Sequence, residues 1–85
     1  NVTVYPNPLT DASNLKVGFS LLQGEDVCVE LCDALGKRIL TKTIQGNAGA
    51  NLFEIPTGEL ALGSGMYTVS VRTDSGTETV KVFIR

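Results

Sequence analysis

The side chains that could do chemistry are two cysteines and a few carboxylates, because the sequence contains no histidine. Without histidine, neither a Ser-His-Asp nor a Cys-His catalytic group can form, and the usual imidazole metal ligands are missing. Glu25 and Asp26 are adjacent carboxylates in a predicted turn, whereas a glycosidase needs two carboxylates that face each other across a cleft. The sequence therefore predicts that the chain is not an enzyme.

Cys28 and Cys32 lie four residues apart on a predicted strand. Their side chains then point to the same face, and their Cα atoms lie about 13 Å apart at ~3.3 Å per residue. A disulfide requires a separation below about 7 Å, so the two thiols are not expected to pair with each other. We interpret them as small half-buried side chains, with a reactive thiol or an intermolecular disulfide as the alternative.

Groups that could bind phosphate, nucleic acid or metal are equally sparse. Gly63-Ser64-Gly65 is followed by a strand pattern, whereas a phosphate loop leads into a helix. Seven basic and nine acidic residues are scattered along the chain and give a net charge of −2, so no nucleic-acid partner is expected. Three aspartates in predicted loops leave calcium as an alternative, although their spacing matches no oxygen-ligand loop: Asp11, Asp33 and Asp74. We expect no metal and no cofactor.

The aromatic side chains offer little to a sugar ligand. The sequence has no tryptophan and only three phenylalanines and two tyrosines. Phe19 and Tyr67 are predicted to point inward, which leaves Phe83 and Tyr5 as candidates for an exposed stacking surface. Carbohydrate binding is therefore kept only as an alternative.

The elements that position these residues are strands. About seven stretches of alternating apolar residues, with turn signals every 8–12 residues, predict an all-β fold, an Ig-like or fibronectin-like β-sandwich of about seven antiparallel strands. The 85 residues suit one small domain, residues 1–85, and no apolar run approaches the ~20 residues of a membrane span, so no stable membrane insertion is expected. Because the sequence starts directly in a strand pattern, we expect a domain excised from a longer secreted protein.

Local signals place the connections. The expected strands cover residues 2–5, 15–21, 27–32, 37–44, 52–55, 67–72 and 79–84. Gly24-Glu25 has the pattern of a two-residue type II′ hairpin loop, and Gly18 indicates a bulge or a close backbone approach. Residues 45–51, rich in glycine and asparagine, are expected to form a surface loop, and residues 57–60 a short helical turn.

Four motifs in fixed order carry a family resemblance. They are Tyr5-Pro6-Asn7-Pro8, Val27-x-Val29-x-Leu31-x-Asp33-x-x-Gly36-Lys37-Arg38, Leu62-x-x-Gly65-x-Tyr67-x-Val69-x-Val71, and Lys81-Val82-Phe83-Ile84-Arg85. Together they resemble the type A C-terminal sorting domain of the type IX (Por) secretion system of Bacteroidetes-type bacteria. One departure is Cys32, which stands where this family usually carries an aromatic residue.

The resemblance implies a non-catalytic secretion signal that targets its cargo across the outer membrane. The implied partners are the outer-membrane type IX machinery and a sortase that cuts upstream, before or near Asn1. The implied route runs through the periplasm to the cell surface or the extracellular space. We expect the domain itself to be a monomer.

The resemblance also assigns roles to the motif residues. Lys81, Val82, Phe83, Ile84 and Arg85 are the implied sorting signal, and we expect residues 79–85 to be an edge or near-edge strand, which can pair with another chain. The other motif residues are expected to be structural. Pro6 and Pro8, with Tyr5 and Asn7, end the first strand; Asp33 starts a type I turn that Gly36 closes in the left-handed region; and Leu62, Gly65 and Tyr67 form a corner.

A second function fits the same strand pattern. The Leu-x-x-Gly-x-Tyr corner also occurs in fibronectin type III domains, so the chain could be an Ig-like accessory or carbohydrate-binding module attached to a secreted hydrolase. A sorting domain must end its full-length protein, whereas an accessory module can be followed by more chain.

Overall fold

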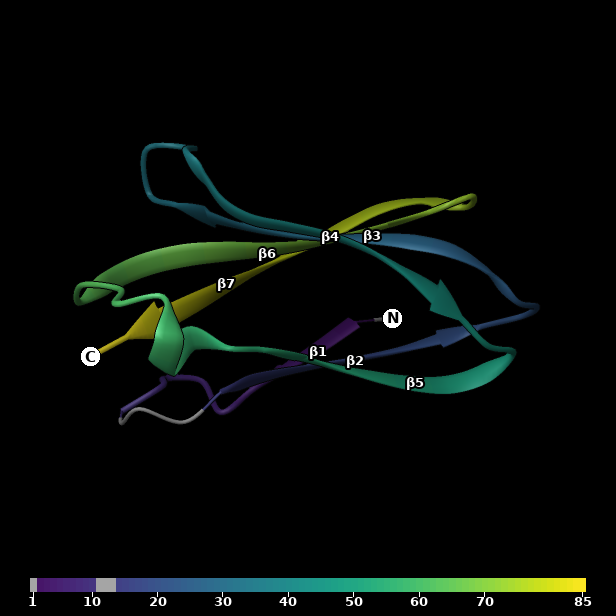
Figure 1. The fold of residues 1–85 in the computed structure, drawn as a ribbon, viewed down its shortest axis with the longest axis horizontal. Coiled ribbons are helices and arrows are strands. Elements are labelled where there is room, and N and C mark those ends of the chain that lie inside the picture. The colour runs from purple at the N-terminus through teal and green to yellow at the C-terminus, as the bar shows by residue number, and fades with distance from the viewer. Residues whose placement is uncertain (1, 11–13) are drawn as a thin grey trace.

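Two facing antiparallel sheets form the fold (Figure 1). The structure is a computed structural model that describes residues 2–10 and 14–85. A three-stranded sheet has the order β1-β2-β5 and a four-stranded sheet the order β4-β3-β6-β7. The elements are β1 (Val2–Tyr5), β2 (Leu15–Leu21), β3 (Glu25–Asp33), β4 (Arg38–Gly46), β5 (Gly49–Ile55), the 3-10 helix η1 (Thr57–Glu59), β6 (Gly65–Thr73) and β7 (Gly76–Ile84). The predicted all-β sandwich is confirmed.

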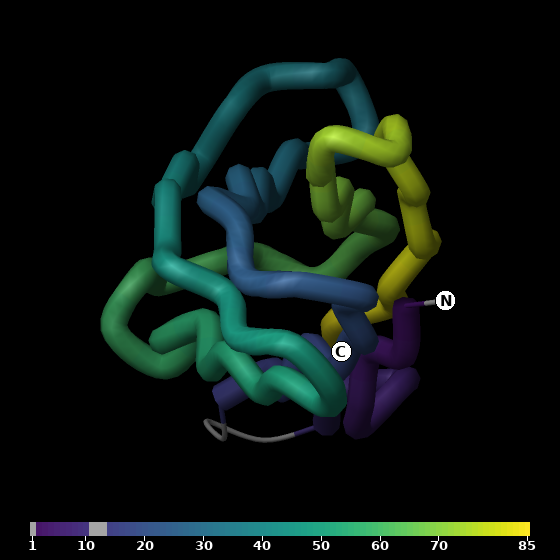
Figure 2. The backbone as a smooth tube through the Cα atoms, turned by 90° about the vertical axis from the view of Figure 1, so that its right-hand side faces the viewer, coloured from purple at the N-terminus to yellow at the C-terminus, as the bar shows by residue number. Residues whose placement is uncertain are grey.

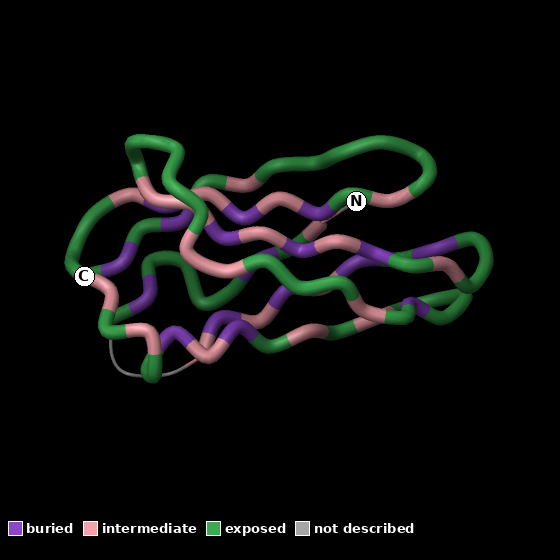
Figure 3. The backbone as a smooth tube through the Cα atoms, turned by 45° about the horizontal axis from the view of Figure 1, so that its top comes forward, coloured by how far each residue is buried: buried purple, intermediate pink, exposed green. Residues whose placement is uncertain are grey.

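The core lies between the sheets and is built from alternating positions of the strands (Figure 3). Because successive side chains of a strand point to opposite faces, every second residue of β2, β3 and β6 is apolar and buried. Each fully buried Val or Leu side chain contributes about 1.5–3 kcal/mol. The inward faces predicted for these strands are confirmed: Leu15, Val17, Phe19 and Leu21; Val27, Val29 and Leu31; Tyr67, Val69 and Val71.

The predicted hairpin at Gly24-Glu25 is wrong. β2 pairs with β1 and β5, whereas β3 pairs with β4 and β6, so residues 22–24 carry the chain from one sheet to the other. Gly24 is also absent from the described glycines with positive φ, which a type II′ loop requires at this position. The connection crosses between sheets because the apolar faces of β2 and β3 pack against each other across the core.

The predicted irregularity at Gly18 is also wrong. Gly18 continues the regular register of β2, opposite Thr3 on one side and Leu52 on the other. A Cβ built there would lie 3.8 Å from the carbonyl oxygen of Asn51, which is ordinary van der Waals contact. The backbone therefore forms neither a bulge nor a close approach at this position.

The surface loop expected over residues 45–51 is in fact almost entirely strand. β4 continues to Gly46 and β5 begins at Gly49, where it pairs with Leu21 of β2. The Asn51 amide closes the sharp connection: its Nδ2 donates to the carbonyl of Asn47 at 2.8 Å, and its Oδ1 accepts from the Asn47 amide at 2.9 Å. The composition indicated a turn, but one side chain supplies the bonds that make it short. The short helical turn after β5 is confirmed as η1.

Candidate recognition surface at the terminal strand

β7 is an edge strand of the four-stranded sheet and pairs along one side with β6. This confirms the edge position expected for residues 79–85. Val82 and Ile84 point into the core and are 0% and 8% exposed. Lys81 and Phe83 point outward, and Phe83 is 53% exposed although it is aromatic. The alternation of β7 therefore fixes which side chains of the terminal strand meet solvent.

The outer edge of β7 is closed by the segment that follows β1. The Asn7 side chain donates from Nδ2 to the Lys81 carbonyl at 3.0 Å and accepts at Oδ1 from the Phe83 amide at 3.1 Å. Leu9 continues the contact: its amide donates to the Phe83 carbonyl at 2.8 Å, and its carbonyl accepts from the Arg85 amide at 2.9 Å. Two ends of the chain that are more than 70 residues apart in sequence are thus bonded side by side (Figure 2).

Asn7 can do this because it stands between two prolines. Proline has no amide hydrogen, so the backbone on either side of Asn7 offers few donors to a neighbouring strand. An asparagine side chain carries both a donor and an acceptor and stands in for a strand residue. The Tyr5-Pro6 and Asn7-Pro8 peptide bonds are both cis. The sequence predicted the stop after β1 but not this bond pair, whose only local signal is an amide residue between prolines.

The remaining motif residues meet at the same end of the sandwich. Asp33 lies opposite Tyr67 on β6, and Tyr67 lies opposite Val82 on β7, so three motifs share one row across the sheet. Asn7 reaches the adjacent positions of β7 from the other sheet's side. In Figure 1 this is the end that holds the C-terminus and the β3–β4 connection. The first and third motifs therefore contact the terminal strand, and the second lies one strand further away in the same row.

Asp33, Gly36 and Tyr67, three of the motif residues predicted to be structural, lie in a turn and a corner. The Asp33 Oδ1 accepts from the amides of Leu35 and Lys37, both at 2.9 Å, and Gly36 has φ of 87°. The Tyr67 hydroxyl donates to the carbonyl of Gly63 at 2.7 Å and anchors the corner.

Gly65, the other corner glycine, has φ of 151° and lies opposite Ile84. Leu62 is half-buried against the core, and Tyr5 is 43% exposed. Next to the terminal strand is a small cavity of about 180 Å³, lined in part by Leu9, Leu62 and Arg85. The corner and the cavity thus belong to the same end of the molecule as the sorting motif.

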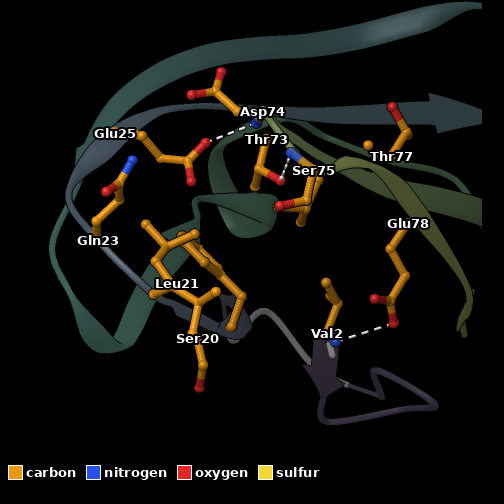
Figure 4. A pocket seen from close by; sticks show the side chains of 14 residues that line it. Val2, Ser20, Leu21, Gln23, Glu25, Thr73, Asp74, Ser75, Thr77 and Glu78 are labelled. Atoms are coloured by element: carbon orange, nitrogen blue, oxygen red, sulfur yellow. Dashed lines mark hydrogen bonds between the residues drawn. The ribbon is translucent and has the colours of Figure 1, made fainter.

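A larger groove lies at the opposite end, and none of the predicted recognition residues lines it. It has a volume of about 630 Å³ and lies between the end of β2 and the β6–β7 hairpin (Figure 4). Three carboxylates line it: Glu25, Asp74 and Glu78. Glu25 Oε1 accepts from the Asp74 amide at 2.7 Å, and Glu78 Oε2 accepts from the Val2 amide at 3.0 Å.

These hydrogen bonds give two of the three groove carboxylates, Glu25 and Glu78, a structural role. The pKa of Glu78 is lowered, first by a hydrogen bond with the chain's amino terminus and then by the one from Val2. Glu25 likewise ties the start of β3 to the β6–β7 turn. Glu25 and Glu78 therefore link neighbouring elements through hydrogen bonds and do not form a pair of free carboxylates for acid–base chemistry.

The two cysteines lie away from this groove. Cys28 and Cys32 are unbridged and half-buried on the outward face of β3, which confirms that they do not pair. In the described ranges 2–10 and 14–85, no three His, Cys, Asp or Glu side chains lie close enough together to hold a metal ion. Asp11 lies outside the described residues. Nor do the helical residues that the structure describes form a segment long and apolar enough to cross a bilayer.

Comparison with solved structures shows the fold. A β-glucosidase from Listeria innocua in complex with glucose superposes with a TM-score of 0.61 at 17% identity, over 99% of this chain and 16% of that one. The same enzyme in complex with isofagomine gives 0.63 at 18% identity, again over 99% and 16%. The chain thus spans about one sixth of the length of these structures. No curated protein matches the chain.

Fold and surface define a two-sheet β-sandwich in which residues of four separate motifs lie at the end that holds the terminal edge strand. The family described as the secretion system C-terminal sorting domain has a model that matches residues 3–85. The chain belongs to this family of type IX secretion signals, as the motif resemblance predicted. Membership implies a non-catalytic domain that interacts with the secretion machinery and signals export to the cell surface or extracellular space.

Proposed function

We propose that this domain directs a cargo protein across the outer membrane and that residues 81–85 are the part the type IX machinery recognises. The observation that supports this most directly is the contact of the first and third family motifs with β7. Asn7 and Leu9 form hydrogen bonds with the edge of the strand, and its own residues Val82 and Ile84 pack into the core. Lys81 and Phe83 face solvent. A signal read by a protein partner needs such fixed and accessible side chains.

The proposal extends to the route of the cargo. Residues 1–85 form one sorting domain at the C-terminal end of a longer exported protein, which passes through the periplasm. A sortase then removes the domain by a cut before or near Asn1, a residue outside the described ranges. The domain acts as a monomer during this passage. These steps rest on membership of the family and on the small, self-contained sandwich core.

The test is a fusion of the whole domain to a periplasmic reporter in a bacterium that has the type IX system. We expect the reporter outside the cell with the domain cut off, and retention in the periplasm in an otherwise identical strain that lacks the outer-membrane machinery. Retention of the reporter in both strains would contradict the proposed function. Release of uncut fusion would support export and contradict the sortase step.

An accessory sugar-binding module of a secreted hydrolase is the second candidate. It draws on the shared fold of the Listeria β-glucosidase structures and on the exposed rings of Tyr5 and Phe83. Binding of the purified domain to a glycan array, lost in Tyr5→Ala and Phe83→Ala, would favour this candidate. We expect no binding, because the two rings lie on strands of different sheets.

A further inference from the structure

Resting on the proposed function, we propose that the machinery reads the terminal strand through the outward side chains of Lys81 and Phe83, and not by adding a strand to its edge. The partner surface that fits is a protein surface of the secretion machinery with an apolar pocket flanked by carboxylates. Three features of the structure carry this inference: the closed edge, the exposed aromatic side chain, and the charge beside it.

The edge is closed where strand addition would need it open. In an antiparallel edge strand, every second residue turns its amide and carbonyl away from the paired neighbour. In the last part of β7 these groups belong to Lys81, Phe83 and Arg85, and the Asn7 side chain and Leu9 backbone form four hydrogen bonds with them. A strand from a partner would have to displace all four bonds before it could pair here.

The part of the edge nearer the β6–β7 hairpin is open only as far as Lys81. There the outward-turned backbone groups belong to Thr77 and Thr79, up to the amide of Lys81. Pairing over residues 77–81 would have the usual length of a strand, but it would stop at Asn7 and reach only Lys81, the first residue of the family motif. Strand addition at this part of β7 would therefore leave residues 82–85 of the motif without contact to the added strand.

The outward face, in contrast, is open and chemically distinct. Phe83 lies opposite the half-buried Met66 of β6, and Lys81 lies opposite Thr68. An exposed aromatic ring beside a methionine is typical of the centre of a protein interface. Lys81 and Arg85, on either side of Phe83 along the strand, place positive charge around this centre. Carboxylates on the partner would complement both cations and orient the approach.

The same contacts that close the edge also hold these side chains in place. Val82 and Ile84 are buried between the outward residues and prevent β7 from rotating about its axis. Asn7 fixes the position of the strand at Lys81 and Phe83. The partner therefore meets a rigid pair of side chains, and binding costs little additional ordering.

Two outward variants test the inference in the reporter fusion of the full domain. We expect Phe83→Ala and Lys81→Glu each to lower the rate of reporter release about tenfold, with melting temperatures of the purified domains close to that of the wild type. The matched controls are Leu22→Ala and Lys42→Glu, which change an exposed apolar and an exposed basic residue elsewhere and are expected to leave release unchanged. Normal release of both outward variants while the wild type is secreted would overturn the inference and leave the proposed function standing.

Variants of Asn7 distinguish recognition through the outward side chains from strand addition at the edge of β7. Asn7→Ala frees the Phe83 amide and the Lys81 carbonyl, and Asn7→Asp keeps the acceptor but loses the donor. We expect neither variant to increase release or capture of the purified domain on detergent-solubilised outer membranes of the secreting host. Increased capture of Asn7→Ala, together with tolerance of Phe83→Ala, would show strand addition and overturn the inference. So would capture by protein-free anionic vesicles that Lys81→Glu abolishes, because the partner would then be lipid.

Discussion

Tyr67 shows how a single residue holds the end of the sandwich where the motifs meet. Its ring is 8% exposed in the core, and its hydroxyl reaches back to the Gly63 carbonyl over the glycine-rich corner. The corner leads directly into the row that joins Asp33, Tyr67 and Val82. Loss of this one bond should therefore loosen the approach to β6 without emptying the core.

We expect Tyr67→Phe to lower the free energy of unfolding by about 1 kcal/mol, because it removes one hydrogen bond and keeps the ring. Tyr5→Phe is the matched control: Tyr5 is half exposed, and its change should stay within about 0.5 kcal/mol of the wild type. Urea denaturation of both variants measures the difference. Equal stabilities would show that the corner bond contributes nothing.

Two glycines form a second matched pair. A Cβ at Gly46 would collide with Leu21 Cδ1 and lie 3.2 Å from Val27 Cγ2 and the Glu25 carbonyl, whereas a Cβ at Gly18 meets only ordinary contacts. We expect Gly46→Ala to cost about 1–3 kcal/mol through overpacking. Gly18→Ala should be neutral or stabilising by up to about 1 kcal/mol, because a strand interior disfavours glycine. Thermal denaturation compares them, and a Gly46→Ala protein as stable as Gly18→Ala would contradict the packing.

At the scale of elements, β7 departs from an ordinary edge strand because its two halves differ. Its last residues are bonded on both sides, to β6 and to the segment of Asn7 and Leu9, whereas its first residues pair with β6. Both halves are exposed at their outward side chains. The difference lies in the backbone, and backbone amides can report it.

Hydrogen exchange followed by NMR should resolve the two halves of β7. We expect the amides of Phe83 and Arg85, which are bonded to Asn7 and Leu9, to exchange at least tenfold more slowly than that of Thr79, which faces the open part of the edge. In Asn7→Ala the Phe83 amide should lose this protection first. Equal exchange at Phe83 and Thr79 in the wild type would contradict the closed edge.

The elements also show what a sequence can predict and where it fails. Alternation gave the inward faces of β2, β3 and β6, because burial imposes a period of two on each strand. The Gly24-Glu25 signal failed because a glycine turn has the same local pattern whether it joins paired strands or crosses between sheets. Asn51 and Asn7 failed to stand out because each acts through side-chain bonds to a neighbour that local spacing does not reveal.

Part of the candidate site can likewise be predicted from the sequence, and part cannot. The edge position of the terminal strand, the turn at Asp33 and Gly36, and the corner at Tyr67 follow from local chemistry and from the motif pattern. The closure of the edge does not, because it joins residues more than 70 positions apart. A contact of that range is fixed by the topology of the whole sandwich, not by any stretch of the chain.

For the molecule as a whole, the terminal strand is both the proposed signal and part of the core. Burial of the Val82 and Ile84 side chains stabilises the fold by about 3–6 kcal/mol in total, at ~1.5–3 kcal/mol each. A domain of this size has a total stability of roughly 4–13 kcal/mol at ~0.05–0.15 kcal/mol per residue. Deletion of residues 81–85 also removes the groups to which Asn7 and Leu9 bond, so it acts on both ends of the chain.

We therefore expect the domain that lacks residues 81–85 to be largely unfolded, with lost dispersion in its NMR spectrum and no cooperative melting transition. The control is the triple variant Lys81→Ser, Phe83→Ser and Arg85→Ser, which changes only exposed side chains and should stay folded. A truncated domain that keeps a native spectrum would contradict the core role of β7. If the truncation unfolds and the triple variant stays folded, only the triple variant can test recognition, because its fold and its backbone edge are intact. Loss of secretion in this variant would then show that the outward side chains are recognised.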